Sequence, residues 1–214
     1  MPTPSDHRAR VRDHLHAEMA AARLLPGEKV NLPSVARALG LSVTPVREAL
    51  TQLVYSGVLE ALPPRGFFVP ALSVADARVC YHAVVALETE ALRLAPGPTP
   101  ATLRALSRAA AVFAKAPSPT ERLGADAALH DLLTAPYRGT GVQHVLSDLK
   151  TRILFYEREF LGADELHGRS VEAHARLIDA LAAGDLDGAS AALRENWLNV
   201  AAVLYDRIPQ SPAS

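Results

Sequence analysis

Apolar residues in the first 55 positions recur at the spacing of short amphipathic helices. Val11, Leu15 and Met19 follow one another at intervals of four and predict a first helix, which Leu25-Pro26-Gly27 ends. Two further apolar stripes comprise Leu32, Val35, Ala36 and Leu39, and then Val46, Ala49, Leu50, Leu53 and Val54. The three residues 40–42 join these two helices. Two short helices joined so closely predict a helix-turn-helix, whose second helix can enter the major groove of DNA.

The pattern changes after the third helix. Residues 58–61 and 66–69 are short strand-like runs on either side of the sequence Pro-Pro-Arg-Gly. Two such runs around a turn are typical of a β-hairpin. We therefore expect a winged helix-turn-helix, made of three helices and a hairpin wing, over residues 1–72.

From Ser73 onward the pattern is that of helices separated by breaks rich in proline and glycine. The breaks lie at residues 96–100, 116–119, 135–141 and 184–188. Roughly six helices fit between them, and neither strands nor an internal repeat are indicated. We expect an antiparallel all-α bundle over residues 73–214, so the predicted fold class is mainly α with two domains.

The composition favours a folded protein in a reducing compartment. The chain has 214 residues, of which 49% are hydrophobic and 21% are charged, and this is enough for two small domains. Its single cysteine, Cys80, excludes an internal disulfide. No run approaches the about 20 apolar residues that span a membrane, and the first residues lack the apolar core of a signal peptide. We expect a cytoplasmic protein without a membrane partner.

Net charge alone does not identify a nucleic-acid-binding protein, because the formal net charge is −1. Residues 1–70 hold eight Lys and Arg against six Asp and Glu, whereas the rest of the chain is acidic. The basic excess therefore lies in the segment with the helix-turn-helix pattern. DNA binding must depend on the placement of individual arginines and helix N-termini.

Four polar residues interrupt apolar helix faces in the second domain. Asp126 and His130 share one face with Leu129 and Leu133, and His174 and Asn196 lie on the apolar faces of two later helices. A divalent cation with oxygen and nitrogen ligands would satisfy these groups together. Alternatively, each is a hydrogen-bonded core residue. Periodicity alone does not show whether they converge.

The N-terminal motifs resemble those of GntR-family transcriptional regulators. The similarity covers about 45 residues in order and comprises Leu-Pro-Gly-Glu-Lys-Val at 25–30, Val-Ala-Arg-Ala-Leu-Gly-Leu-Ser-Val-Thr-Pro-Val-Arg-Glu-Ala-Leu at 35–50, Gly-Val-Leu at 57–59 and Arg-Gly-Phe-Phe-Val at 65–69. This resemblance implies a bacterial-type regulator that binds double-stranded operator DNA.

The resemblance also assigns the DNA contacts. It places Ser42, Thr44 and Arg47 in the recognition helix, and Arg65 and Gly66 at a wing tip that reaches the minor groove. An arginine can bind guanine or clamp a phosphate, and the two hydroxyls can bond phosphate or base edges, or else only cap the helix.

Two positions depart from the family pattern near the DNA. Val43 stands where an arginine usually follows the serine, and Pro33-Ser34 replaces a charged residue early in the second helix. The operator sequence and affinity therefore cannot be carried over from the family.

The C-terminal segment resembles the FCD effector domain of the FadR-like branch. Its metal-ligand pattern matches Asp126, His130 and His174, but Asn196 stands where the family has a third histidine. The resemblance implies a divalent ion, zinc or nickel-like, that helps to hold a small carboxylate effector. Val84 replaces an arginine that commonly assists.

Two residues on the segment 149–160 are candidates to replace that missing arginine. We name Arg152 and Tyr156 as possible effector contacts. His82, His144 and His167 are left out of the site, since each is more simply structural or solvated, and the flanking glycines place His167 in a loop.

Three functions remain to be compared. The first is a homodimeric regulator that recognises a palindromic operator and responds to an effector. The second is the same regulator with a metal-free pocket for an acyl-thioester or another apolar ligand, which Asn196 and Val84 keep open. The third, a metal-dependent hydrolase, is disfavoured because the chain has no HExxH motif, nucleophile motif or phosphate-binding glycine loop. We predict a regulator and not an enzyme.

Overall fold

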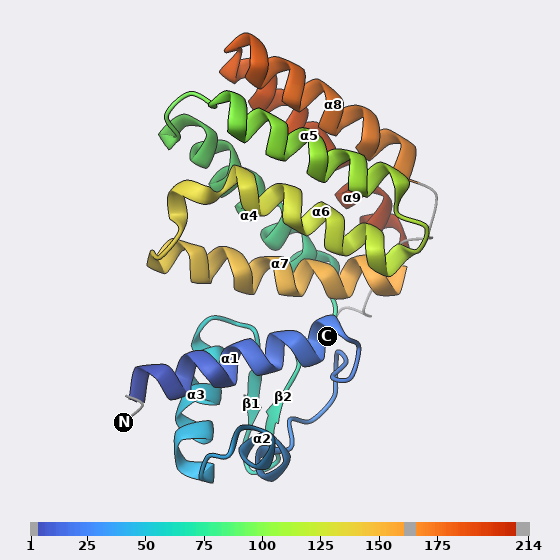
Figure 1. The fold of residues 1–214 in the computed structure, drawn as a ribbon. Helices are drawn as coiled ribbons and strands as arrows, with labels where there is room; N and C mark the ends of the chain where they lie inside the picture. The colour runs from blue at the N-terminus through green and yellow to red at the C-terminus, as the bar shows by residue number, and fades with distance from the viewer. Residues whose placement is uncertain (1–3, 161–165, 209–214) are drawn as a thin grey trace.

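The computed structural model describes residues 4–160 and 166–208, which form nine α-helices, one 3-10 turn and two strands (Figure 1). The first unit contains α1 (Pro4–Ala20), α2 (Leu32–Leu39), α3 (Val43–Tyr55), β1 (Glu60–Leu62) and β2 (Gly66–Phe68). The second unit contains α4 (Val74–Leu94), α5 (Pro100–Lys115), α6 (Pro119–Leu133), the 3-10 turn η1 (Ala135–Tyr137), α7 (Gly141–Phe160), α8 (His167–Ala183) and α9 (Leu186–Arg207). None of the described helices is both long and apolar enough to cross a membrane.

The first unit is a winged helix-turn-helix with its own apolar core. Asn31 caps α2 by accepting a hydrogen bond from the backbone N–H of Ser34 at 3.0 Å. Gly40 ends α2 with a φ of 64°, a conformation that glycine adopts without strain, and this lets α3 begin three residues later. The strands β1 and β2 pair in antiparallel fashion to form the wing. The three helices of this unit and its hairpin are as predicted.

The second unit is a bundle of six α-helices, which confirms the predicted fold class. Ser73 caps α4 through the N–H of Asp76, and α4 then runs through the middle of the bundle in contact with α6, α7 and α9. Apolar residues such as Val84, Leu129 and Leu193 form one continuous core. Because α4 is packed against several helices, the polar residues on its buried face have fixed neighbours.

The loop expected at His167 is wrong, because this residue begins α8. Leu166, which precedes it, is buried and anchors the start of the helix against the bundle. Gly168 therefore lies in the first helical turn, and burial of neighbouring apolar residues outweighs the low helix propensity of glycine.

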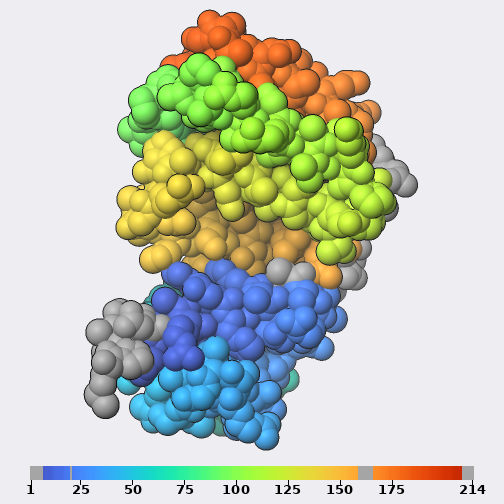
Figure 2. Space-filling view, in the orientation of Figure 1, coloured from blue at the N-terminus to red at the C-terminus, as the bar shows by residue number. Residues whose placement is uncertain are grey.

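The two units are stacked, with α1 of the first lying along α7 of the second (Figures 1 and 2). Phe155 of α7 is only 5% exposed and belongs to the apolar core of the first unit. The helices α2 and α3 lie on the side of α1 that is remote from the bundle (Figure 1). A domain boundary between residues 72 and 73 remains a prediction.

Candidate DNA-binding face and metal cluster

The start of α3 presents the residue types that contact DNA. Ser42, Thr44 and Arg47 are all exposed, and Ser42 occupies the N-cap position without using its hydroxyl to cap the helix. The backbone N–H groups at this end are therefore also available to a phosphate. Val43 is 39% exposed on the same surface, so an apolar side chain stands where the family has an arginine.

The wing places a second cation beside a glycine at the hairpin turn. Arg65 is exposed, and its guanidinium lies 5.1 Å from the ring centre of Phe68. Gly66 has a φ of 112°, and a Cβ atom there would lie 3.2 Å from Cε of Lys29. This turn therefore requires glycine for its backbone conformation, whatever contact it makes with DNA.

Asp126, His130 and His174 come together although they lie on two different helices. Asp126 and His130 are one turn apart on α6, and His174 faces them from α8. The Nε2 atom of His130 lies 3.6 Å from Oδ2 of Asp126, and the Nε2 atom of His174 lies 3.3 Å from Oδ1 of the same carboxylate. All three donor atoms lie within 4.8 Å of one another. Nitrogen and oxygen donors grouped in this way fit a divalent transition metal.

Two observations test whether the residues fit an ion. The Nε2 atom of His130 is buried and has no hydrogen-bond partner among the described residues, so it can bind an ion when it carries no proton. The amide Nδ2 of Asn196, on α9, lies 3.4 Å from Nε2 of His174. A half-turn of this amide exchanges its nitrogen and oxygen, which would offer a fourth, oxygen ligand. The site therefore fits a metal with three strong ligands and one weak ligand.

Glu88, which the sequence analysis missed, holds the histidine in place. Its carboxylate is fully buried and accepts hydrogen bonds from Nδ1 of His130 at 2.6 Å and from Nε1 of Trp197 at 2.7 Å. Its other oxygen lies 2.9 Å from Nζ of Lys150. A carboxylate on Nδ1 orients the ring so that Nε2 faces the cluster, as in carboxylate–histidine–metal triads. The signal was present in the sequence, since Glu88 interrupts an apolar stripe of α4.

Charges in this network balance one another. Burial disfavours ionisation of Glu88, but the positive charges of His130 and Lys150 outweigh it and lower its pKa. Burial likewise opposes protonation of His130, yet Glu88 and Asp126 raise its pKa. For Asp126 the effect of burial is outweighed by His130 and His174, so its pKa is lowered.

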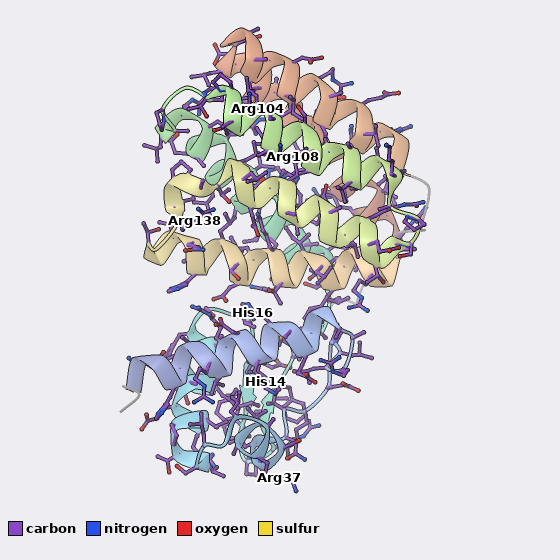
Figure 3. The ribbon with its side chains drawn as sticks, in the orientation of Figure 1. His14, His16, Arg37, Arg104, Arg108 and Arg138 are labelled. Carbon is purple, nitrogen blue, oxygen red and sulfur yellow. The ribbon has the colours of Figure 1, made fainter. Side chains whose placement is uncertain are left out.

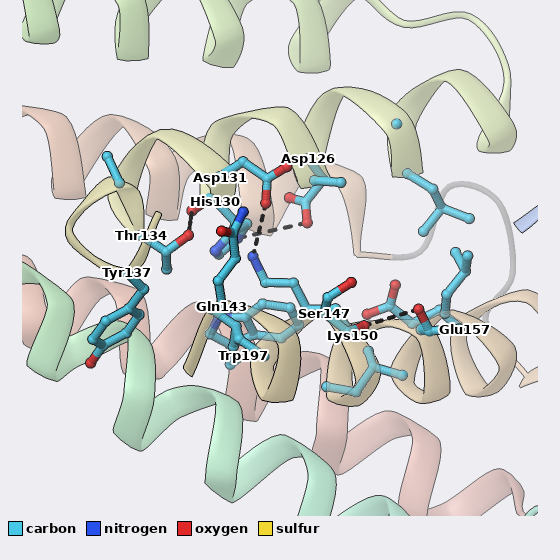
Figure 4. Close-up of a pocket in the computed structure, with 18 of the residues that line it drawn as sticks. Asp126, His130, Asp131, Thr134, Tyr137, Gln143, Ser147, Lys150, Glu157 and Trp197 are labelled. Carbon is cyan, nitrogen blue, oxygen red and sulfur yellow. Dashed lines mark hydrogen bonds and ion pairs between the residues drawn. The ribbon is translucent and has the colours of Figure 1, made fainter. Parts of the chain in front are cut away.

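A cavity of about 710 Å³ opens beside the cluster between α6 and α7 (Figure 4). Asp126, His130 and Trp197 form one wall, and the α7 residues that line it include Ser147, Lys150 and Glu157. A second cavity of about 340 Å³ shares several of these residues and adds apolar ones, among them Phe113, Leu166 and Val200. This volume accommodates a small-molecule ligand.

Lys150 of α7 is one of the cations that line the cavity, and no arginine of α4 lines it. Val84 is fully buried in the bundle core, so its position does not reach the cavity. The Nζ atom of Lys150 is held by Glu88 and lies 3.4 Å from Oδ1 of Asp131, which is 73% exposed (Figure 4). An exposed carboxylate is easily replaced by another anion, because its own ion pair contributes little.

The geometry does not support Arg152 and Tyr156 as effector contacts. They project from another face of α7, toward the junction of the two units, and neither lines the cavity. The guanidinium of Arg152 forms an ion pair with Asp76, and the hydroxyl of Tyr156 donates to a carboxylate oxygen of Asp76 at 2.8 Å. The helical period accounts for this placement, since these residues lie half a turn or more from Lys150 and Leu154.

The three histidines that were not assigned to the site from the sequence differ in their exposure and contacts. His82 and His144 are exposed. His167, however, lines the smaller cavity, and its ring packs 4.8 Å from that of Phe113. It does not belong to the group of donor atoms formed by Asp126, His130 and His174, and it adds to the wall of the cavity.

Glu157 is an acidic group held in its neutral form. It lines both cavities and accepts a hydrogen bond from the hydroxyl of Tyr81 at 3.1 Å. Burial, followed by the negative charge of Asp126, raises the pKa of Glu157 to about 8. At neutral pH its carboxyl therefore presents a hydrogen-bond donor as well as acceptors to the cavity.

These features define a class: a winged helix-turn-helix DNA-binding unit joined to a helical ligand-binding unit. Residues 7–69 match the family described as bacterial regulatory proteins, gntR family, and residues 80–198 match the FCD domain. The chain belongs to the gntR family of bacterial regulatory proteins, with an FCD effector-binding domain. It is therefore a transcriptional regulator and not an enzyme, and the hydrolase alternative is set aside.

Curated relatives are similar in sequence to this chain over part of their length. The chain is 38% identical over 86 residues to an uncharacterized HTH-type transcriptional regulator in the TAR-I ttuE-ttuC' intergenic region of Agrobacterium vitis, a segment that covers 39% of this chain and half of that relative. It is 38% identical over 60 residues to the HTH-type regulator McbR of Escherichia coli K12, covering 28% of this chain and 27% of McbR. The chain thus aligns with half or less of these relatives.

Solved structures share the whole fold. E. coli McbR/YncC superposes with a TM-score of 0.76 at 24% identity, covering 95% of this chain and 99% of that one. A GntR-type transcriptional regulator from Rhodococcus sp. RHA1 gives a TM-score of 0.74 at 22% identity, covering 94% and 99%. At such identities the likeness concerns the arrangement of both units and not their ligands.

The raised pKa of Glu157 predicts a specific pH dependence of stability. In the unfolded chain this carboxyl ionises near its ordinary value of 4.5, whereas in the folded protein it keeps its proton up to about pH 8. Stability should therefore fall as pH rises between these values. We expect the melting temperature of the Glu157→Gln variant, measured without metal, to match wild type near pH 4.5 and to exceed it by several degrees at pH 8.

The matched control is Glu172→Gln, which removes an exposed carboxyl from α8. Its difference from wild type should stay constant over the same pH range. A constant difference for Glu157→Gln as well would show that Glu157 ionises normally in the folded protein.

Proposed function

We propose that this chain regulates transcription by binding operator DNA with an affinity that changes when a small carboxylate binds beside a divalent metal in the FCD domain. The observation that carries the proposal is the convergence of Asp126, His130 and His174, of which Asp126 and His130 line a ligand-sized cavity. Effector control follows if the ligand has different affinities for two arrangements of the two units.

Asp126, His130 and His174 would hold the ion, with Asn196 as the weakest ligand. A zinc or nickel-like ion would supply an open coordination position that accepts a carboxylate oxygen. Lys150 lies on the same cavity wall and supplies a positive charge for an anionic ligand, in place of the arginine that Val84 replaces. An incoming carboxylate would displace Asp131 from Lys150, while Glu88 would continue to hold the ammonium group.

DNA binding is assigned to Ser42, Thr44 and Arg47 of α3 and to Arg65 and Gly66 of the wing. A single copy offers one recognition helix, whereas a twofold dimer offers two that match the half-sites of a palindrome. We therefore propose a homodimer, although the present structure contains one copy. The remaining alternative is a metal-free pocket for an apolar ligand, which the apolar wall of the smaller cavity favours.

The DNA-binding role predicts that Arg47→Ala weakens binding to a duplex selected by the wild-type protein from a random pool. The loss of one bidentate arginine contact costs about 1–3 kcal/mol, or roughly 5- to 150-fold in Kd. Fluorescence anisotropy measures it. The control is Arg104→Ala, an exposed arginine of α5 in the bundle (Figure 3). Equal affinities of the two variants would remove Arg47 from the interface.

The metal proposal predicts near-stoichiometric metal in untagged protein purified without chelator, as measured by elemental analysis. His130→Ala should lose it, and Asn196→His should bind zinc more tightly because imidazole is a stronger ligand than an amide oxygen. Glu88→Gln should weaken zinc binding about 10- to 100-fold by removing the charge behind His130. Glu90→Gln, an exposed position on the same helix, is the control.

Absence of metal from wild type and from Asn196→His would overturn the metal site and favour the apolar-ligand alternative. Unchanged zinc affinity in Glu88→Gln would show that the carboxylate only stabilises the fold.

The role of Lys150 predicts that metal-loaded wild type binds succinate more tightly than succinamide, its uncharged analogue. Lys150→Met should lose at least about tenfold in succinate affinity while keeping its metal, because a charge-assisted hydrogen bond contributes roughly 1.5–3 kcal/mol. Isothermal titration calorimetry measures both ligands. Lys115→Met, an exposed lysine of α5, should behave as wild type. Succinate affinity equal in Lys150→Met and wild type would exclude Lys150 as the anion contact.

A further inference from the structure

The helix α7 has two faces with different neighbours. One face lines the larger cavity, with Thr151, Leu154 and Glu157 among its residues. Another face lies against α1 of the DNA-binding unit, where Phe155 is buried in that unit's core (Figure 1). The same rigid element therefore touches both the ligand cavity and the DNA-binding unit.

Two side chains of α7 line the ligand cavity and also contact α1. Ser147 lines the larger cavity, and its hydroxyl lies 3.4 Å from Nδ1 of His16 on α1. Arg158 lines both cavities and donates a hydrogen bond from Nη1 to the backbone carbonyl of Met19 at 3.3 Å. The two residues are three helical turns apart, roughly 16 Å along α7, and both contact the C-terminal part of α1.

The contact between α1 and α7 includes buried groups on both helices. Asp148 is 7% exposed and lies 3.1 Å from Nε2 of His16, which faces the bundle (Figure 3). Met19, whose carbonyl receives Arg158, is fully buried. Packed interiors move as units or change to another packing, because they are close to crystal density. A shift of α7 must therefore move α1 or break these contacts.

The helix α1 passes any movement to the recognition helix. It packs directly on α3, and Val11 and Leu15 share one apolar core with Val46 and Leu50 of that helix. Both Leu15 and Leu50 are fully buried. An unbroken series of packed elements thus leads from the cavity through α7 and α1 to the helix that carries Arg47.

We propose that α7 couples the occupied state of the cavity to the position of the DNA-binding unit, with Ser147 and Arg158 as the bridging residues. A ligand group that bonds either side chain competes with its contact to α1 and so changes the relative free energies of two packings of α1 on α7. This inference rests on the proposed function, and it names how that function is regulated. Because coupling is reciprocal, bound DNA must change α7 as ligand does.

The test uses DNA as the probe, so the effector need not be known. The full-length protein is studied by hydrogen–deuterium exchange with and without a duplex that wild type selected from a random pool. We expect DNA to change the exchange of amides in residues 147–158, on the far side of α1 from the recognition helix. In the double variant Ser147→Ala, Arg158→Gln this change should be lost, while the Kd for the duplex stays within about threefold of wild type.

The matched control is Ser107→Ala, Arg108→Gln, which makes the same changes at exposed positions of α5. It should keep the DNA-dependent change. If the bridging double variant does not fold, His16→Gln removes the imidazole that Ser147 contacts and should reduce the DNA-dependent change, while Arg158 keeps its bond to Met19.

Either of two results would overturn the coupling while leaving the proposed function intact: no change in residues 147–158 of DNA-bound wild type, or a change that persists in folded bridging variants. Failure of wild type to select any duplex would overturn the proposed function, and the coupling with it.

Discussion

The arrangement of the second unit depends on one buried carboxylate. Glu88 of α4 is inaccessible to solvent, and it is held by groups from three other helices: His130 of α6, Lys150 of α7 and Trp197 of α9. A charge without solvent is tolerated only when partners satisfy it, and removal of one partner leaves a large penalty. Four helices are thus fixed around one group, and the orientation of His130 and the position of Lys150 follow from it.

Much of the fold follows from the sequence because it depends on local periodicity. The stripes of α2 and α3, the glycine between them and the breaks of the second unit each act over a few residues, so the winged helix-turn-helix and the six-helix bundle were both predicted. The start of α8 was not, since flanking glycines indicated a loop while burial of Leu166 favoured a helix. Tertiary burial outweighs local propensity there.

The candidate site, like the fold, was predictable from the sequence only in part. Periodicity placed Asp126, His130 and His174 on inward faces, but only the packing of α6 on its neighbours decides whether they meet. On α7 polar residues occupy more than one face, so the sequence did not show which face lines the cavity. In the structure Lys150 lines the larger cavity, and Arg152 and Tyr156 do not. Glu88 interrupts an apolar stripe, but the sequence does not show that its partner is His130, 42 residues away on another helix.

Phe155 has a consequence for how such regulators can be recombined. Its ring completes the core of the DNA-binding unit although it is carried by the other unit. A DNA-binding unit excised from this chain would keep an unfilled hollow under α1, so the two halves are not interchangeable modules. Any helical domain that replaced this one would need a large apolar side chain at the position of Phe155. This requirement restricts the domains with which the DNA-binding unit can be combined.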